Sequence, residues 1–162
     1  MIRETPSVPL IISLGSNLGN RIDNIERATK MLENSFVLTA SSHIYQSKAV
    51  DYLDQPDFYN QILEFVLPSM GKEAILDIAL GVEAEMGRER TIPKGPRNID
   101  IDILFAGEMP FKSVKLILPH PRIFERHFIV IPIRELPAYS TLTAIYDFPQ
   151  FFPTEMSLQV VR

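Results

Sequence analysis

The feature that most constrains this chain is the regular alternation of polar and apolar residues from Asn98 to Ala106. Successive side chains of an extended strand point to opposite faces, so residues two apart share a face. One face carries Ile99, Ile101, Ile103 and Phe105, and the other carries Asp100, Asp102 and Leu104. The pattern predicts a strand that buries its apolar face and holds two carboxylates side by side on the opposite face.

Turn signals and hydrophobic periods divide the chain before this strand into further elements. Strands are predicted at Val8 to Leu14, Phe36 to Tyr45 and Tyr59 to Leu67. Helices are predicted after Asn20, a suitable cap, and after Ser69, with Gly87 at a left-handed end. The order strand, helix, strand, strand, helix, strand is that of ferredoxin-like domains. We therefore expect an α+β fold, with a ferredoxin-like βαββαβ core, an antiparallel sheet and helices mainly on one face.

Two parts of the chain are less regular. The segment from Gln46 to Asp57 is polar and contains proline, and such a long loop is more often functional or mobile than ornamental, so it is a candidate lid. Farther along, we expect a C-terminal helical extension from about Ile123 to Leu136, interrupted or kinked at Pro132. The residues from Tyr139 onward show no period. No repeat interrupts the sequence, so residues 1–162 are predicted to form a single domain.

The composition excludes several chemistries. The 162 residues include no cysteine, which excludes disulfides, thiolate zinc sites and cysteine nucleophiles. No apolar run is long enough to span a membrane. A net charge of −4 argues against bulk nucleic-acid binding, which needs a basic face. We expect a cytoplasmic monomer that binds neither nucleic acid nor membrane.

The two aspartates of the predicted strand suggest a metal site. Asp100 and Asp102 would hold their carboxylates a few ångströms apart, and like charges that close repel each other. A hard divalent cation supplies the compensating charge, and magnesium in particular takes one or two carboxylates together with phosphates and waters. The spacing alone fits equally well two acids that face solvent on a half-exposed sheet.

A basic segment immediately before the strand favours the metal interpretation. Between Arg88 and Arg97 the chain has four basic residues and one acid, on a protein whose net charge is negative. Guanidinium groups are planar donors matched to phosphate oxygens, although a short charge run alone is more often a solvated loop. Cations for a phosphate next to carboxylates for its metal predict magnesium-nucleotide chemistry.

Three other positions are weaker candidates. Gly15 to Gly19 lacks the spacing and the lysine of a Walker motif, and we interpret it as a structural turn. His120 lies between two prolines and could donate to a phosphate, although a lone histidine is more often a packed or surface residue. Glu83 flanks the apolar face of the second helix, where it either orients an arginine or a ribose, or has no role.

With these residues in place, the chain resembles the 6-hydroxymethyl-7,8-dihydropterin pyrophosphokinase family of folate biosynthesis from about Leu10 to Ala138. The most specific match is Gly95-Pro96-Arg97-Asn98-Ile99-Asp100-Ile101-Asp102-Ile103, close to the family's Gly-Pro-Arg-x-x-Asp-x-Asp-Ile signature. Other segments similar to family motifs are the opening turn Leu14 to Gly19, the pterin strand Asp57 to Asn60, the basic motif Gly87 to Arg90, and Pro119 to Pro121 with Arg126 and Phe128.

The resemblance implies an ATP-dependent diphosphotransferase that moves the β,γ-diphosphate of ATP to the hydroxymethyl group of 6-hydroxymethyl-7,8-dihydropterin and releases AMP. It implies two Mg²⁺ ions, with ATP as co-substrate, and catalysis by Arg88, Arg97, Asp100 and Asp102, the last two being the metal ligands. ATP is expected to contact Glu83, Arg88, Arg90, Arg97, Ile103, Lys115, His120 and Arg126. The pterin is expected to contact Ser47, Lys48, Val50, Phe58, Asn60, Asp100 and Phe128, with its flat ring between the two phenylalanines.

Three departures from the family pattern bear on closure over the pterin. Tryptophan is usual in the family where Lys94 stands, Thr-Pro-Pro-like residues where Ser47-Lys48-Ala49 stands, and tyrosine where Pro121 stands. Without the indole we expect looser pterin binding, which Lys94→Trp would tighten, and a lysine that reaches toward a phosphate instead.

The leading alternative from another class is a ferredoxin-like binding module, either an RNA-recognition domain or a small-molecule sensor. The strands lack the aromatic pattern that stacks bases, and paired aspartates repel a phosphate backbone, so RNA is disfavoured. A catalytically silent nucleotide sensor stays open.

Overall fold

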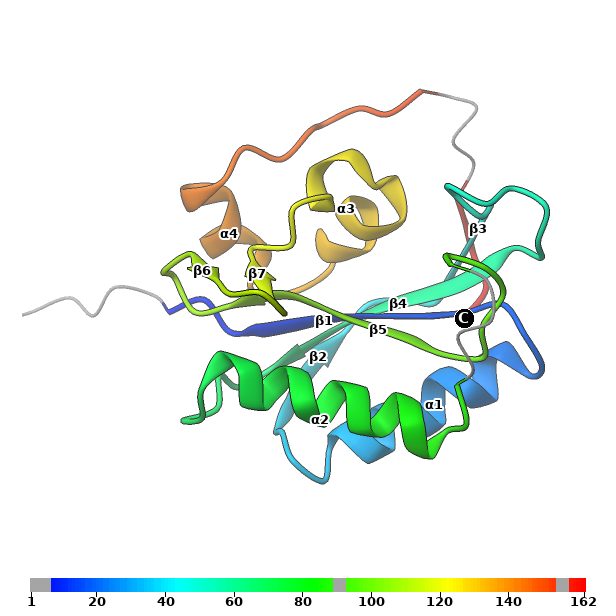
Figure 1. Ribbon diagram of the computed structural model, residues 1–162. Helices are drawn as coiled ribbons and strands as arrows, with labels where there is room; N and C mark the ends of the chain where they lie inside the picture. The colour runs from blue at the N-terminus through cyan, green and yellow to red at the C-terminus, as the bar shows by residue number, and fades with distance from the viewer. Residues whose placement is uncertain (1–6, 89–92, 154–157) are drawn as a thin grey trace, which may run out of the picture.

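Within residues 7–88, 93–153 and 158–162, which the computed structural model describes, six strands form one antiparallel sheet (Figure 1). They are β1 (Leu10–Ser16), β2 (Leu38–Ser41), β3 (Tyr45–Ser47), β4 (Phe58–Phe65), β5 (Asp100–Ala106) and β8 (Leu158–Val160). The order across the sheet is β5, β1, β4, β3 and β8, and β2 also pairs with β4. A separate hairpin joins β6 (Phe111–Lys112) to β7 (Ile117–Leu118).

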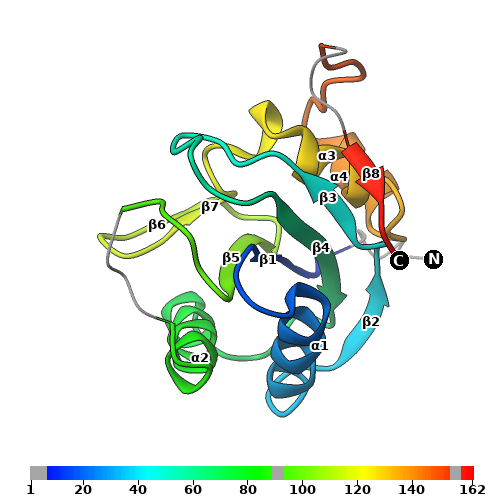
Figure 2. The same cartoon turned by 90° about the vertical axis from the view of Figure 1, so that its right-hand side faces the viewer.

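Helices cover both faces of this sheet. The longer helices α1 (Arg21–Leu32) and α2 (Lys72–Glu85) lie side by side on one face (Figure 2). On the opposite face lie α3 (His127–Ile133), which follows a short 3₁₀ helix (Ile123–Glu125), and α4 (Tyr139–Ile145) (Figure 1). The expected mixture of helices with an antiparallel sheet is therefore present, but the second face is covered as well because the chain folds back over it. In the described part of the chain, no helix has the length and apolarity needed to cross a membrane.

The first helix begins where the sequence predicts. The side chain of Asn20 accepts a hydrogen bond from the backbone N–H of Asp23 at 3.0 Å, which satisfies one of the free donors of the first turn. Ile25, Ala28 and Leu32 recur on the inward face of α1 and are fully buried. The second helix begins later than expected, after Gly71 rather than after Ser69.

Two strand predictions need correction. β1 continues through Gly15 and Ser16, which we expected to form a turn, because these residues pair with Asn60 and Tyr59 of β4. The single strand expected from Phe36 to Tyr45 is divided into β2 and β3, and the register on β4 shifts by one residue between them, from Ser41 opposite Leu63 to Tyr45 opposite Asn60.

A β-bulge interrupts the alternation of β5. Ile103 pairs with Ile12 of β1, whereas Phe105 pairs with the adjacent Ile11, so Leu104 is the extra residue. The bulge turns Phe105 away from the face of the isoleucines, and its ring packs near Tyr146, with ring centroids 5.3 Å apart. The predicted common face for Ile103 and Phe105 is therefore wrong, whereas Asp100 and Asp102 precede the bulge and keep their shared face.

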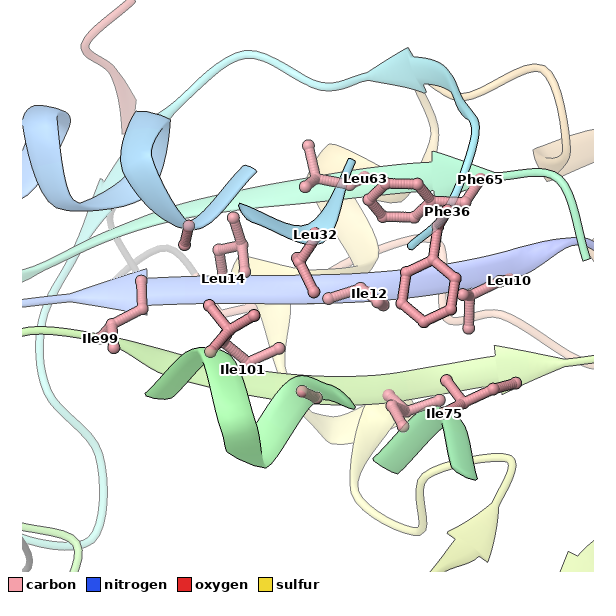
Figure 3. Packing of buried hydrophobic residues seen from close by; sticks show 14 of the residues in the cluster. Leu10, Ile12, Leu14, Leu32, Phe36, Leu63, Phe65, Ile75, Ile99 and Ile101 are labelled. Carbon is pink, nitrogen blue, oxygen red and sulfur yellow. The ribbon is translucent and has the colours of Figure 1, made fainter. Parts of the chain in front are cut away.

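The sheet separates two apolar cores. The larger one lies between the sheet and the helices α1 and α2, where Leu14 lies beside its strand partner Ile101, and Ile75 belongs to the same cluster (Figure 3). The other lies under α3 and α4 and contains Leu104 and Phe105. Burial of one such side chain contributes about 1.5–3 kcal/mol, so both cores hold β5 firmly in place.

Candidate active site

A cavity of about 230 Å³ opens on the sheet face that carries α3, where β1, β3, β4 and β5 end or begin. Most of the residues predicted for the site line this cavity together. They are Ser47, Lys48, Val50, Phe58, Asn60, Arg88, Arg97, Asp100, Asp102, His120, Arg126 and Phe128. Residues that are distant in the sequence thus meet in one place, and it contains both the carboxylate pair and the arginines.

The two carboxylates differ in their surroundings. Asp100 pairs with Gly15 in the sheet and accepts hydrogen bonds from Arg88 Nη1 at 2.9 Å and from Arg97 Nη2 at 3.2 Å. Asp102 has no such donor among its described neighbours. Its burial, and then the charge of Asp100, raise the pKa of the Asp102 carboxyl to about 7.

This arrangement fits a magnesium site that is completed by a ligand. In the described part of the chain, no three His, Cys, Asp or Glu side chains converge to hold a metal by themselves. The charges of Arg126 and Arg97 offset the effects of burial and of Asp100 on the Asp102 pKa only in part, and magnesium typically takes one or two carboxylates with substrate phosphates and waters. Asp100 and Asp102 are thus a suitable pair for a metal that arrives with phosphates.

The end of α2 sets the position of Arg88. Gly87 has a left-handed backbone with φ 75°. The N–H of Gly87 donates to the carbonyl of Ala84 at 3.0 Å and that of Arg88 to the carbonyl of Glu83 at 3.1 Å, which is a Schellman motif. The Arg88 guanidinium also pairs with the buried carboxylate of Glu83. The sequence leaves open whether Glu83 orients an arginine, orients a ribose or has no role, and the structure shows it paired with an arginine.

Asn17 fixes Arg97 and the loop of residues 48–57 to the end of β1. Its buried side chain accepts a hydrogen bond from Arg97 N at 2.9 Å and donates to the carbonyl of Pro56 at 2.9 Å and to Gln55 Oε1 at 3.0 Å. The guanidinium of Arg97 then lies over the ring of Phe58, 4.7 Å from its centroid. The sequence predicts only a turn at Asn17, because spacing alone cannot show which loops an amide will join.

His120 is held against β5 in its neutral form. The backbone N–H of His120 donates to the carbonyl of Leu104 at 3.0 Å. The ring Nδ1 accepts from the backbone N–H of Arg122 at 3.2 Å, so the ring proton is on Nε2. Burial and the charge of Arg126 lower the pKa of His120, which leaves the imidazole neutral at pH 7. Arg126 also lines the cavity and lies 5.7 Å from the ring centroid of Phe128.

The other half of the cavity has apolar walls and a few polar groups. Phe58 and Phe128 line it from β4 and α3. The amide of Asn60 donates to Ser47 Oγ at 2.7 Å, and both side chains are buried. A Cβ at Gly15 would lie 3.2 Å from Asn60 Oδ1, so this glycine leaves the space that the amide occupies. Apolar walls with a few fixed polar groups are typical of sites for flat organic ligands.

Four predicted ATP contacts are not among the cavity-lining residues. The side chain of Ile103 is 3% exposed and packs in the core on the α1 and α2 side, so a ligand in the cavity could reach only its main chain. Lys115 is exposed in the turn between β6 and β7. Glu83 is buried behind Arg88. Arg90 lies outside the described residues.

Among the other lining residues, Ser13, Gly15 and Asp51 have no predicted ligand, and Lys94 is expected only to reach toward a phosphate. Asp51 and Lys94 lie 3.6 Å apart, measured from Asp51 Oδ2 to Lys94 Nζ. Asp51 also accepts two hydrogen bonds from Arg122, at 2.9 and 3.3 Å. Asp51 belongs to the predicted lid, but no periodicity or motif marks it out.

Comparison with known proteins bears on this geometry. The sequence model of the 7,8-dihydro-6-hydroxymethylpterin-pyrophosphokinase (HPPK) family matches residues 11–138. The chain is 35% identical to the 2-amino-4-hydroxy-6-hydroxymethyldihydropteridine pyrophosphokinase of Bacillus subtilis (strain 168), over 77% of this chain and 75% of that one. The enzyme of the same name from Aquifex aeolicus is 37% identical, over 77% of this chain and 78% of its own.

Several relatives are much longer. A mitochondrial folate synthesis bifunctional protein of Arabidopsis thaliana is 38% identical over 78% of this chain. The chain spans only 17–26% of the length of that protein and three further relatives described as folate or folic acid synthesis proteins.

Solved structures support the fold. A structure described as HPPK-DHPS in complex with substrates superposes with a TM-score of 0.62 at 14% identity, over 81% of this chain and 40% of that one. A Plasmodium falciparum HPPK-DHPS structure described as wild type with pteroate gives 0.58 at 13% identity, over 83% and 39%. At these identities the likeness concerns the fold alone.

Proposed function

Because the chain belongs to the 7,8-dihydro-6-hydroxymethylpterin-pyrophosphokinase family, we propose that it transfers the β,γ-diphosphate of ATP to the hydroxymethyl group of 6-hydroxymethyl-7,8-dihydropterin in folate biosynthesis. AMP is the second product. The observation that carries the proposal is that one cavity joins the carboxylates of Asp100 and Asp102, three arginines, and an apolar compartment with fixed amides and hydroxyls.

The polar half of the cavity is the proposed ATP site. Arg88, Arg97 and Arg126 would bind phosphate oxygens with their guanidinium groups, and His120 would donate from Nε2. Asp100 and Asp102 would hold two Mg²⁺ ions, which when bound would neutralise negative charge on the phosphates. Arg90 and Lys115 stay as proposed contacts, Ile103 as a main-chain contact, and Glu83 as the residue that orients Arg88.

The apolar half is the proposed pterin site. The flat ring would lie against Phe58 and Phe128, and stacking would supply affinity. Asn60 and Ser47, already hydrogen-bonded to each other, would orient the polar edge of the ring, with Lys48 and Val50 at the mouth.

The proposed reaction is an in-line displacement at the β-phosphorus of ATP. The hydroxymethyl oxygen forms the new bond to this phosphorus, the bond to the oxygen that bridges the α- and β-phosphorus breaks, and AMP leaves. Arg88 and Arg97, fixed by Glu83, Asp100 and Asn17, need little reorganisation to face the spreading negative charge. The hydroxyl proton is released to solvent, and no strong general base is needed, which agrees with the lowered pKa of His120 that makes its imidazole a weak base.

Three finer points are also proposals. The order β1, α1, β2 and β3, β4, α2, β5 corresponds to a ferredoxin-like core, with α3 and α4 as its C-terminal extension. Residues 1–162 are proposed to act as a single domain. We propose a cytoplasmic monomer whose partners are the two small-molecule substrates.

The test is incubation of the protein with Mg-ATP and 6-hydroxymethyl-7,8-dihydropterin, followed by chromatography of the nucleotides. Formation of AMP in equal amount to the pterin diphosphate is expected. ADP as the sole nucleotide product would refute diphosphate transfer, and tight ATP binding without turnover would indicate the nucleotide sensor instead.

A further inference from the structure

Three separate segments meet at the mouth of the cavity through one carboxylate. Asp51, in the loop of residues 48–57, accepts hydrogen bonds from Nη1 and Nη2 of Arg122, at 2.9 and 3.3 Å. Its Oδ2 also lies 3.6 Å from Nζ of Lys94, which belongs to the segment before β5. These ion pairs hold the pterin side and the nucleotide side of the cavity together.

The backbone at two of these residues is left-handed. Asp51 has φ 66°, which an aspartate tolerates, whereas Lys94 has φ 58°, which a lysine rarely adopts. Gln55 reinforces the closed arrangement, since its amide donates to the carbonyl of Lys94 at 3.0 Å. The loops therefore keep this conformation through contacts with each other rather than through local preference.

The closed arrangement leaves little room. The cavity volume of about 230 Å³ is below the range of roughly 300–1,000 Å³ that is usual for sites enclosing one drug-sized ligand. The proposed function requires two substrates, one of them a nucleotide. The cavity does not enclose both substrates, so the nucleotide has to extend into the mouth, where the ion pairs of Asp51 lie.

We propose that Asp51 occupies the place of a ligand anion, holding Lys94 and Arg122 until the triphosphate of Mg-ATP takes these two cations over. This inference rests on the proposed function, adds Arg122 to its nucleotide contacts, and gives Lys94, which is expected from the sequence to reach toward a phosphate, a partner before ATP binds. The exchange is chemically matched, because phosphate oxygens are acceptors for the same guanidinium and ammonium donors as the carboxylate. Asp51 thereby weakens the first encounter with ATP, and its release is coupled to opening of the mouth.

The test measures the affinity for α,β-methylene-ATP with Mg²⁺ by isothermal titration calorimetry. Asp51→Asn removes the charge but keeps a residue that tolerates a left-handed backbone. We expect the dissociation constant of this variant for the nucleotide to fall about three- to tenfold, because two partly exposed ion pairs no longer compete with the phosphates for Lys94 and Arg122. The matched control is Asp54→Asn, an exposed acid of the same loop without an ion pair among the described residues, for which less than about a twofold change is expected.

A second variant identifies the cations. In Asp51→Asn/Arg122→Gln, the gain over the wild type should be lost in large part, because the guanidinium that Asp51 releases, paired through Nε with Glu125 alone, is no longer present. Equal gains in Asp51→Asn and Asp54→Asn would assign the effect to net charge and overturn the proposal. Weaker nucleotide binding by Asp51→Asn would show a purely structural clasp and overturn it as well. The AMP assay on the wild type tests the proposed function separately, so the two failures can be told apart.

Discussion

At the scale of single residues, the two aspartates of β5 differ more than their spacing suggests. Asp100 is already neutralised by Arg88 and Arg97, whereas Asp102 has burial and a neighbouring negative charge as the main influences on its pKa. A cation is therefore needed most at Asp102. This difference leads to a prediction for the metal-free protein.

We predict that metal-free Asp102→Asn is more stable than the metal-free wild type at pH 8. The folded wild type binds the Asp102 proton more tightly than the unfolded chain, with a pKa of about 7, so its stability falls as the pH rises from about 4 to about 7. The difference should reach about 1–3 kcal/mol at pH 8 and vanish near pH 4.

Urea unfolding in the presence of EDTA across this pH range measures the effect. Parallel pH profiles for the two proteins would contradict it. Mg²⁺ added together with α,β-methylene-ATP at pH 8, without EDTA, should stabilise the wild type more than the variant, and the variant should form no AMP.

Gly15→Ala should selectively weaken pterin binding. The added Cβ would lie 3.2 Å from Asn60 Oδ1 and 3.5 Å from the ring of Phe58, so the amide must shift. We expect the KM for the pterin to rise about tenfold, the effect of roughly 1.4 kcal/mol, with unchanged affinity for Mg-α,β-methylene-ATP. Gly71→Ala, where nothing lies within 4 Å of the new Cβ, is the control in steady-state kinetics. A similar rise in the control would remove the steric explanation.

At the scale of elements, the C-terminal end of α2 joins helix geometry to the site. Gly81 and Gly87 both have open space around a new Cβ, but only Gly87 has a positive φ, of 75°. The two glycines therefore separate the need for space from the need for a left-handed backbone.

Gly81→Ala should stabilise the protein by about 0.5–1 kcal/mol, because alanine has the higher helix propensity, and should leave turnover unchanged. Gly87→Ala should destabilise it by about 1–2 kcal/mol and lower AMP formation about tenfold or more, since Arg88 follows directly. Thermal unfolding and the AMP assay measure both. Equal stability changes of one sign would be inconsistent with the backbone argument.

The elements that the sequence predicts well are those with strong periods or caps. Asn20, Gly87 and the alternation from Asp100 to Ile103 are local signals, and the structure bears them out. The bulge that reverses Phe105 depends on the pairing with β1, which no single strand reveals. Similarly, α4 and β8 acquire their structure from the core and from β3, so they have no readable pattern of their own.

The site shows the same division. The signature strand and the arginines were sufficient to predict that Asp100, Asp102, Arg88 and Arg97 belong together, and they line one cavity. Asn17 and Asp51 act through hydrogen bonds and ion pairs across long sequence separations, so only the three-dimensional arrangement identifies them. The roles assigned to individual residues stay predictions.

At the scale of the whole molecule, the last strand, β8, supports the site by pairing with β3, which carries a cavity residue. β8 pairs with β3 so that Leu158 is opposite Ser47, a cavity residue, and Val161 N donates to the carbonyl of Ile44 at 2.8 Å. The short strand β3 is thus held on both sides.

Deletion of residues 158–162 should leave β3 as a poorly supported edge strand. We expect a loss of about 1–3 kcal/mol in the free energy of unfolding and a higher KM for the pterin, with little change in kcat. Arg162→Gln, which breaks only an exposed ion pair with Glu26, should cost less than about 0.5 kcal/mol and serves as the control. Loss of kcat at unchanged KM would contradict a supporting role for β8.

The pairing of Asp100 with two arginines also has a consequence for which anions the resting protein selects. A bare inorganic phosphate ion would draw Arg88 and Arg97 away from Asp100 and leave that carboxylate uncompensated beside Asp102. A triphosphate that brings its own divalent cation satisfies arginines and carboxylates together. The acids of β5 thus disfavour anions that bring no cation, and we expect the protein to bind Mg-ATP much more tightly than free inorganic phosphate.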